Sequence, residues 1–362
     1  MSNGEVVFLF GSGISFPTGM FSSKEIEDCL VDGSWIDSNL QYKRSKNTPR
    51  LKYQEIISLV RKELHQLKLR SKLLEIKNIN YEDIYSTIYQ IFYYYDGYPN
   101  IVAQPFLESV YRKIILEICP NDRYPGNVLK NTLSFINSAI KDLLTFTKNG
   151  EYITKNIIKG FDFFDRMNEC GEIKKVTIFS LNHDLLIERY LGDLLYIPIK
   201  PMGNDVKKCN IDNKHQSKKF ILYKLHGSVD WDVNMADIFH TEFGILTGSC
   251  VKENNYYKKV YPQLFDEFHQ TLLNTNTIFI SGYGWNDNGI NGRIINWLES
   301  HEENRIVIFA RDISPISYIE TRKEPPSALW SNWDKWVEEK KIIVIEKWIS
   351  ESCLSDIICY NR

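Results

Sequence analysis

The segment VTIFSLNHDLLIE, residues 176–188, passes from a run of β-branched and apolar residues to three polar residues and then to a helical apolar pattern. This order is typical of a buried strand that ends in a polar tip and continues into a helix. Ligands bind at the carboxyl ends of the strands in open α/β sheets. The sequence therefore places Asn182 and Asp184 where such proteins usually carry out their chemistry.

Three other apolar runs end in polar residues or glycine. These runs and the residues that follow them are Glu5–Phe10 with Gly11, Ser12, Gly13 and Ser15; Phe220–Leu225 with His226, Gly227 and Ser228; and Thr277–Ser281 with Gly282, Tyr283 and Asp287. Helical patterns separate the runs, which predicts a mostly parallel sheet with crossover connections. Because the carboxyl ends of parallel strands share one edge, we expect these tips to line a single pocket.

Each tip also has a simpler interpretation. Asn182 could be a cap residue, His226 a hydrogen-bonded structural residue, and Asp287 the cap of the following helix. The glycine-rich turn could be an ordinary connection, because Phe16 stands where the third glycine of a G-x-G-x-x-G fingerprint would fall. No second ligand stands at metal-binding distance in sequence from His183, so we expect no metal there. Only the joint pattern favours a ligand site.

A helical block interrupts the α/β pattern at residues 38–169, and the predicted Rossmann-like domain comprises residues 1–37 and 170–362. Asn80 is a predicted N-cap, and apolar residues recur at helical spacing after it. A second apolar stripe runs from Leu129 to Leu144, with Gly150 as the expected helix stop. Thr154–Met167 is predicted to be helical as well.

Composition excludes several classes of protein. Lys and Arg total 44 and Asp and Glu total 46, so the net charge of −2 does not indicate direct nucleic-acid binding. The seven cysteines form no C-x-x-C pair, which favours a reducing compartment over a disulfide framework or a zinc ribbon. We find no apolar run of the roughly 20 residues that a membrane span needs, and no signal-peptide pattern. These features predict a cytoplasmic protein.

The tips resemble the motifs of the Sir2-like (sirtuin-like) family. Gly11-Ser12-Gly13-Ile14-Ser15 is similar to its Gly-Ala-Gly-x-Ser signature, Asn182-His183-Asp184 to its Asn-x-Asp motif, and His226-Gly227 to its catalytic His-Gly. The segment from Gly282 to Asp287 resembles the Gly-Tyr-Ser-x-x-Asp loop of the bacterial branch of the family. The resemblance implies an NAD+-binding Rossmann-like Sir2 fold with a large helical insertion.

The same resemblance implies an activity and a set of roles. The bacterial branch hydrolyses NAD+ to nicotinamide and ADP-ribose and acts in antiphage defence, where loss of NAD+ arrests the infected cell. By this resemblance Asn182 orients water or the nicotinamide ribose, and His226 is the general base. Asp184 contacts the carboxamide or ribose. The remaining implied NAD+-binding residues are Gly11, Ser12, Gly13, Ser15, Gly227, Ser228, Gly282, Tyr283, Asp287 and Asp312, the two aspartates near the adenosine ribose.

Two departures and the size of the chain refine this expectation. Ser12 replaces the usual alanine, a change that should be tolerated, and His183 replaces the usual isoleucine or tyrosine beside the nicotinamide pocket. The zinc-binding cysteines of the protein deacylases are missing, which disfavours that branch. The resemblance to compact defence proteins implies a homo-oligomer and a separate trigger such as a HerA-type ATPase. A non-catalytic NAD+ or ADP-ribose sensor is the alternative function.

Overall fold

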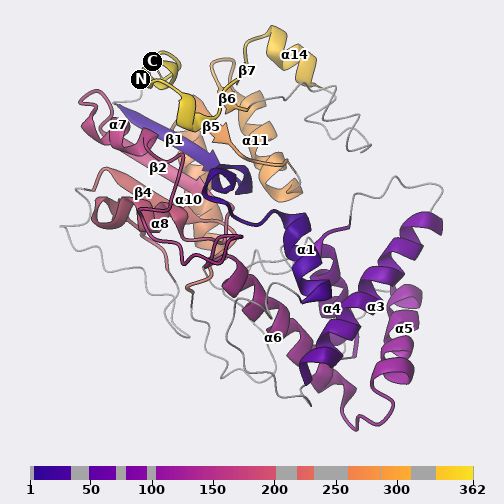
Figure 1. Ribbon diagram of the computed structural model, residues 1–362. Helices are drawn as coiled ribbons and strands as arrows, with labels where there is room; N and C mark the ends of the chain where they lie inside the picture. Colours follow the sequence, from indigo (N-terminus) through magenta and orange to yellow (C-terminus); the bar gives the residue numbers. More distant parts are fainter. Residues whose placement is uncertain are drawn as a thin grey trace.

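A seven-stranded, all-parallel sheet forms the centre of the protein (Figure 1). The computed structural model describes residues 4–33, 49–70, 79–95, 103–200, 218–231, 260–285, 287–310 and 332–361. The strands are β1 (Glu5–Phe10), β2 (Lys175–Ser180), β3 (Leu195–Tyr196), β4 (Phe220–Lys224), β5 (Thr277–Ser281), β6 (Arg305–Phe309) and β7 (Ile342–Ile345). Their order across the sheet is β3-β4-β2-β1-β5-β6-β7. The predicted Rossmann-like α/β fold is confirmed.

Helices cover both faces of this sheet, because its central strands are apolar on both sides. Phe8 and Phe10 of β1 pack in one core, and Val7 and Leu9 pack in the other. The first core includes α7 (Phe163–Glu169), α8 (Leu186–Leu191), η4 (Ile349–Glu351) and α15 (Leu354–Ile358). The second core includes α10 (Tyr261–Leu273), α11 (Asn288–Ser300) and α14 (Trp333–Glu338). The sheet is therefore a buried, doubly covered layer.

The helical block lies beside the sheet, on the side toward which β1 points (Figure 1). Its elements within residues 38–169 are α3 (Pro49–Arg70), α4 (Tyr81–Tyr95), α5 (Gln104–Lys113) with the π-helical turn η2 (Ile114–Ile118), and α6 (Pro125–Leu143). Helix α1 (Ser23–Asp32), from the segment predicted to belong to the Rossmann-like domain, packs against α3, α4 and α6, whereas α7 packs in the core of the sheet. The predicted apolar stripe of α6 is buried, and so are Tyr81, Tyr85 and Tyr89 of α4. These side chains belong to the same core as one face of the sheet. The block is thus packed onto the site-bearing edge.

Three local predictions were wrong, and one short strand was missed. The turn after β1 is a 3₁₀-helix, η1 (Ser12–Thr18), rather than an open loop. Helix α6 ends at Leu143, and Gly150, at a φ of 79°, turns the chain so that Phe146 can bridge to Tyr152. Only the end of the predicted helix 154–167 forms, since Gly160 adopts a left-handed φ of 80° before α7. The two-residue strand β3 was not predicted at all.

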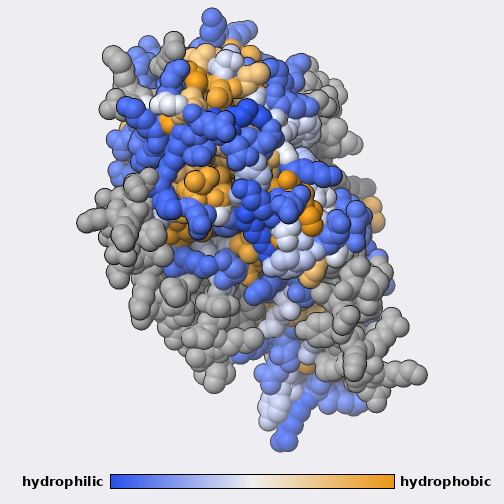
Figure 2. Space-filling model, turned by 60° about the vertical axis from the view of Figure 1, so that its left-hand side comes forward, coloured by the Kyte–Doolittle hydropathy of each residue, from blue (hydrophilic) through white to orange (hydrophobic). Residues whose placement is uncertain are grey.

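Hydrophilic residues surround small groups of hydrophobic ones on the face drawn in Figure 2. This pattern is ordinary for a folded domain whose large apolar side chains lie mostly inside. The described residues contain no helix that is long and apolar enough to cross a membrane.

Candidate functional site

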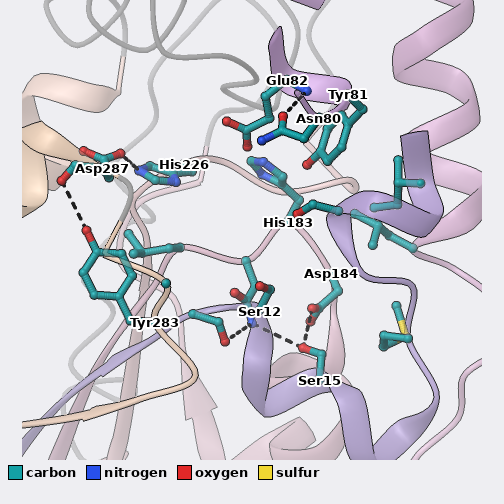
Figure 3. A pocket seen from close by; sticks show the side chains of 18 of the residues that line it. Ser12, Ser15, Asn80, Tyr81, Glu82, His183, Asp184, His226, Tyr283 and Asp287 are labelled. Atoms are coloured by element: carbon teal, nitrogen blue, oxygen red, sulfur yellow. Dashed lines mark hydrogen bonds and ion pairs between the residues drawn. The ribbon is translucent and has the colours of Figure 1, made fainter. Parts of the chain in front are cut away.

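The carboxyl ends of β1, β2 and β5 and the turn after β4 meet at one pocket with a volume of about 230 Å³ (Figure 3). Its lining includes residues from all four predicted tips: Gly11, Ser12, Ser15, Asn182, His183, Asp184, His226, Tyr283 and Asp287. The remaining walls come from the start of α1, the start of α4 and the end of α6. The tips converge as expected for a parallel sheet, and the helical block closes the site from the opposite side.

The tips are numbered here in chain order, after β1, β2, β4 and β5. The first and fourth tips pack closely against each other through their glycines. The N–H of Gly11 donates to the carbonyl of Ser281 (3.0 Å), and that of Gly13 donates to the carbonyl of Gly282 (2.9 Å). A Cβ at Gly13 would lie 2.6 Å from the Gly282 Cα, and a Cβ at Gly282 would lie 2.4 Å from the Ile14 nitrogen. Gly282 also has a φ of 66°, which favours glycine. Packing between loops therefore requires these glycines.

This interlocking changes the expected role of the turn after β1. Gly11 and Gly13 were expected to bind NAD+, but their backbone amides already donate to the carbonyls of Ser281 and Gly282. The hydroxyl of Ser12, which lines the pocket, is a donor that this turn can still present to a ligand.

Asn182 is held by the first tip through both protons of its amide. Its Nδ2 donates to the carbonyl of Gly11 (3.1 Å) and to the Oγ of Ser15 (3.3 Å). The Ser15 hydroxyl in turn donates to Asp184 Oδ2 (2.8 Å). All three side chains are buried. With both amide protons used, Oδ1 is the atom through which Asn182 can accept a hydrogen bond from a ligand or water.

Asp184 anchors the second tip. Its Oδ2 accepts from Ser15, and its Oδ1 accepts from the N–H of Leu186 (3.1 Å), where α8 begins. The resemblance implied that this carboxylate contacts carboxamide or ribose. In the structure both of its oxygens already accept hydrogen bonds that shape the loop, although a carboxylate oxygen can accept a second hydrogen bond.

The second and third tips are joined along their backbones. The N–H of Leu225 donates to the carbonyl of Ser180 (2.9 Å), and that of Val229 donates to the carbonyl of His183 (3.0 Å). These two hydrogen bonds hold the loop that carries Asn182 and His183 against the loop that carries His226.

His226 lies against a carboxylate from the fourth tip. Its Nε2 is 2.9 Å from Oδ2 of Asp287, and both side chains are buried (Figure 3). The other oxygen of Asp287 accepts from the N–H of Ile290 (3.0 Å) and so caps α11. The Tyr283 hydroxyl donates to the Asp287 carbonyl (3.2 Å). Asp287 was expected near the adenosine ribose, but its carboxylate is directed at the histidine; the capping role foreseen for it is confirmed.

Sequence reasoning missed the wall that α4 contributes. Asn80, Tyr81 and Glu82 line the pocket, and Glu82 and His183 point toward one another across it (Figure 3). Asn80 Oδ1 accepts from the N–H of Glu82 (2.8 Å), which fixes the start of the helix. The sequence predicted this N-cap, but it gave no indication that the start of the helix lines the same pocket as the strand tips.

The other predicted residues lie at or beyond the margin of the site. Gly13, Gly227, Ser228 and Gly282 do not belong to the described lining of the pocket. Gly227 has a φ of 84° in the turn that precedes the buried Ser228. Asp312 lies outside the described residues. Within the described ranges, no group of three or more His, Cys, Asp or Glu side chains could hold a metal ion.

These features define a class: an open, parallel α/β protein with a ligand pocket at the carboxyl edge of its sheet. Residues 176–341 match the SIR2-like domain family, a segment that runs from β2 to the last turn before β7 and includes Asn182, His226 and Asp287. The match supports the Sir2-like family indicated by the motifs, and the fold agrees with it. Sir2-like proteins are generally NAD+-dependent enzymes, so the match implies NAD+ binding. No curated protein matches the chain.

Proposed function

We propose that the protein is an NAD+ glycohydrolase, which cleaves the bond between nicotinamide and ribose and releases nicotinamide and ADP-ribose. One observation carries the proposal. Asn182 and His226, which follow neighbouring strands, line one pocket; two hydrogen bonds hold the Asn182 amide, and His226 lies against the carboxylate of Asp287. A hydrolase of this kind needs such a fixed pair, one group to orient the attacking water and one to take its proton.

The charges around the pocket suit this reaction. When the glycosidic bond breaks, positive charge develops on the ribose while nicotinamide leaves as a neutral molecule. The carboxylates of Glu82, Asp184 and Asp287 line the pocket. Negative charges that are already in place stabilise a developing positive charge without reorganisation. In this proposal Asn182 Oδ1 holds the water, His226 accepts its proton, and Ser12 contacts the pyrophosphate.

A non-catalytic sensor of NAD+ or ADP-ribose is the alternative function, and a protein deacylase would additionally need a channel for acyl-lysine. The sensor would keep the interlocked glycines but would have no need of His226. Nicotinamide release that is lost on His226→Ala separates the hydrolase from the sensor, and release that requires an acylated peptide would reveal a deacylase.

For the cellular role we propose cytoplasmic depletion of NAD+ in phage-infected cells, with the chain acting as a homo-oligomer under a separate trigger protein such as a HerA-type ATPase. The motif resemblance supports this role. Expression in bacteria that are challenged with phage tests it: cellular NAD+ should fall on infection with the wild-type chain and should stay constant with His226→Ala.

A further inference from the structure

Lys224 is a buried cation that the proposed reaction does not use. It is the last residue of β4, two positions before His226, and its side chain is 1% exposed. Lysine is almost never fully buried unless its charge is paired, because removing an ammonium group from water is costly. The side chain therefore needs a compensating set of contacts, and these contacts lead to the other half of the site.

The ammonium group of Lys224 has two partners. Its Nζ donates to the main-chain carbonyl of Asp184, in the second tip, and lies 3.2 Å from Oε1 of Glu188 on α8. Burial raises the pKa of Glu188, although the nearby Lys224 acts in the opposite direction. Oε2 of Glu188 is buried without a hydrogen-bond partner among the described residues. The pair is thus far from an ideal stabilising contact.

Energetics alone do not explain such a pair. A buried ion pair can often be replaced by uncharged residues of similar volume without loss of stability, whereas removing one partner is strongly destabilising. What the pair does supply is a fixed position for the main chain at Asp184. Asp184 is held at three points, with Ser15 at Oδ2, Leu186 at Oδ1 and Lys224 at the main-chain oxygen. Ser15, which donates to Oδ2 of Asp184, also accepts a hydrogen bond from Nδ2 of Asn182.

We infer that Lys224 is a positioning residue of the site, with Glu188 as its counter-charge. Through the carbonyl of Asp184 it connects the loop that carries Asn182 to the end of β4, two residues before His226, and so sets the position of one side chain relative to the other. This inference rests on the proposed function for its kinetic consequence, but its structural consequence can be measured separately.

The test compares Lys224→Met with the double variant Lys224→Met/Glu188→Gln in the full chain. The single variant leaves the Glu188 carboxylate buried without its cation, and its Tm should fall. The double variant removes both charges and should regain most of the lost Tm. Its kcat for nicotinamide release should nevertheless stay about tenfold or more below wild type, with the KM for NAD+ changed by no more than about threefold. A double variant with wild-type Tm and wild-type kcat would overturn the inference.

Lys200→Met is the matched control. Lys200 and Asp230 form an ion pair near the same loops, but both side chains are about one-third exposed. This variant should keep its kcat, because a surface pair contributes little.

Hydrogen exchange separates this inference from the proposed function. In the double variant, deuterium uptake should rise in the peptide covering residues 181–187, while β2 and β4 remain as protected as in the wild type. If the wild-type chain released no nicotinamide, the hydrolase proposal would fail, yet faster exchange in this loop would still support the tie. Unchanged exchange in the loop would overturn it.

Discussion

Nε2 of His226 and Oδ2 of Asp287 lie 2.9 Å apart, and both buried side chains line the same pocket. The second carboxylate oxygen of Asp287 caps α11 through the N–H of Ile290. One carboxyl group thus sets the start of a helix and the orientation of the proposed general base. The start of α11 and the imidazole are coupled, so a change at Asp287 acts on stability and on activity through different atoms.

Two substitutions of Asp287 should separate these effects. Asn is as good an N-cap as Asp, so Asp287→Asn should retain the wild-type Tm. It removes the charge beside His226, and kcat should fall at least about tenfold. Asp287→Ala should show the same loss of kcat and, in addition, lose about 1 kcal/mol of stability with the cap. Thermal unfolding and nicotinamide release measure the two effects; wild-type kcat in Asp287→Asn would refute an orienting role.

The hydroxyl of Ser15 should be essential for kcat, whereas that of Ser12 should affect only the binding of NAD+. Ser15→Ala removes the bridge between Asn182 and Asp184 and leaves buried polar atoms without a partner, at a cost of about 1–3 kcal/mol. Its kcat should fall because Asn182 loses one of its two anchors. Ser12→Ala is the comparison: Ser12 lines the pocket and is proposed to contact the pyrophosphate, so its loss should raise the KM for NAD+ and leave kcat and Tm unchanged. Equal kinetics for the two variants would contradict this prediction.

Gly282 should tolerate no side chain. Gly282→Ala places a Cβ against the Ile14 nitrogen and imposes a positive φ on alanine, which should reduce the Tm and the affinity for NAD+ together. Gly292 lies inside α11, and a Cβ there would meet nothing within 4 Å. Gly292→Ala should raise stability by up to about 1 kcal/mol and leave NAD+ affinity unchanged. Calorimetric titration with NAD+ would distinguish the two.

Glu82 should discriminate between NAD+ and its product. The nicotinamide ring of NAD+ carries a positive charge that ADP-ribose lacks, and Glu82 lines the pocket. Glu82→Gln should weaken NAD+ binding roughly two- to fivefold, the effect of one partly solvated charge, and leave ADP-ribose affinity unchanged. Glu108→Gln, on the exposed face of α5, is the control. An equal loss of affinity for both ligands would show that Glu82 does not sense the ring.

The sheet and its polar tips were predictable because both follow from local patterns. Apolar runs separated by helical patterns specify parallel strands, and parallel strands must bring their carboxyl ends to one edge. That rule was enough to place Asn182 and His226 at one pocket. The motifs then indicated which ligand the edge would hold.

The contacts made at those tips were not predictable in the same way. The interlocking of Gly13 with Gly282, the tie from Lys224 to Asp184 and the wall formed by Glu82 each join segments far apart in the chain. No local pattern encodes which side chain a loop will meet across a pocket. For the same reason the contact between Asp287 and His226 was not predicted, because the motif identified the loop but not its partner across the pocket.

The errors in predicted secondary structure arose in segments where the sequence pattern was weak. Residues 154–162 have a helical apolar pattern, but Gly160 and the packing of the following aromatic residues favour turns. Strand β3 has only two residues, too few to show the alternation of apolar and polar residues that indicates a strand. Neither error affects the pocket, because neither segment contributes a residue to its lining.

Nicotinamide release from NAD+ is the most direct test of the central claim, measured with the purified full chain beside Asn182→Ala and His226→Ala. The wild-type chain should release nicotinamide and ADP-ribose in equal amounts. Each variant should lose at least about a hundredfold in kcat while its affinity for NAD+ stays within about tenfold, or 1.4 kcal/mol. Release that survives both substitutions would contradict the assignment of these residues, and a wild-type chain that does not bind NAD+ at all would contradict the site itself.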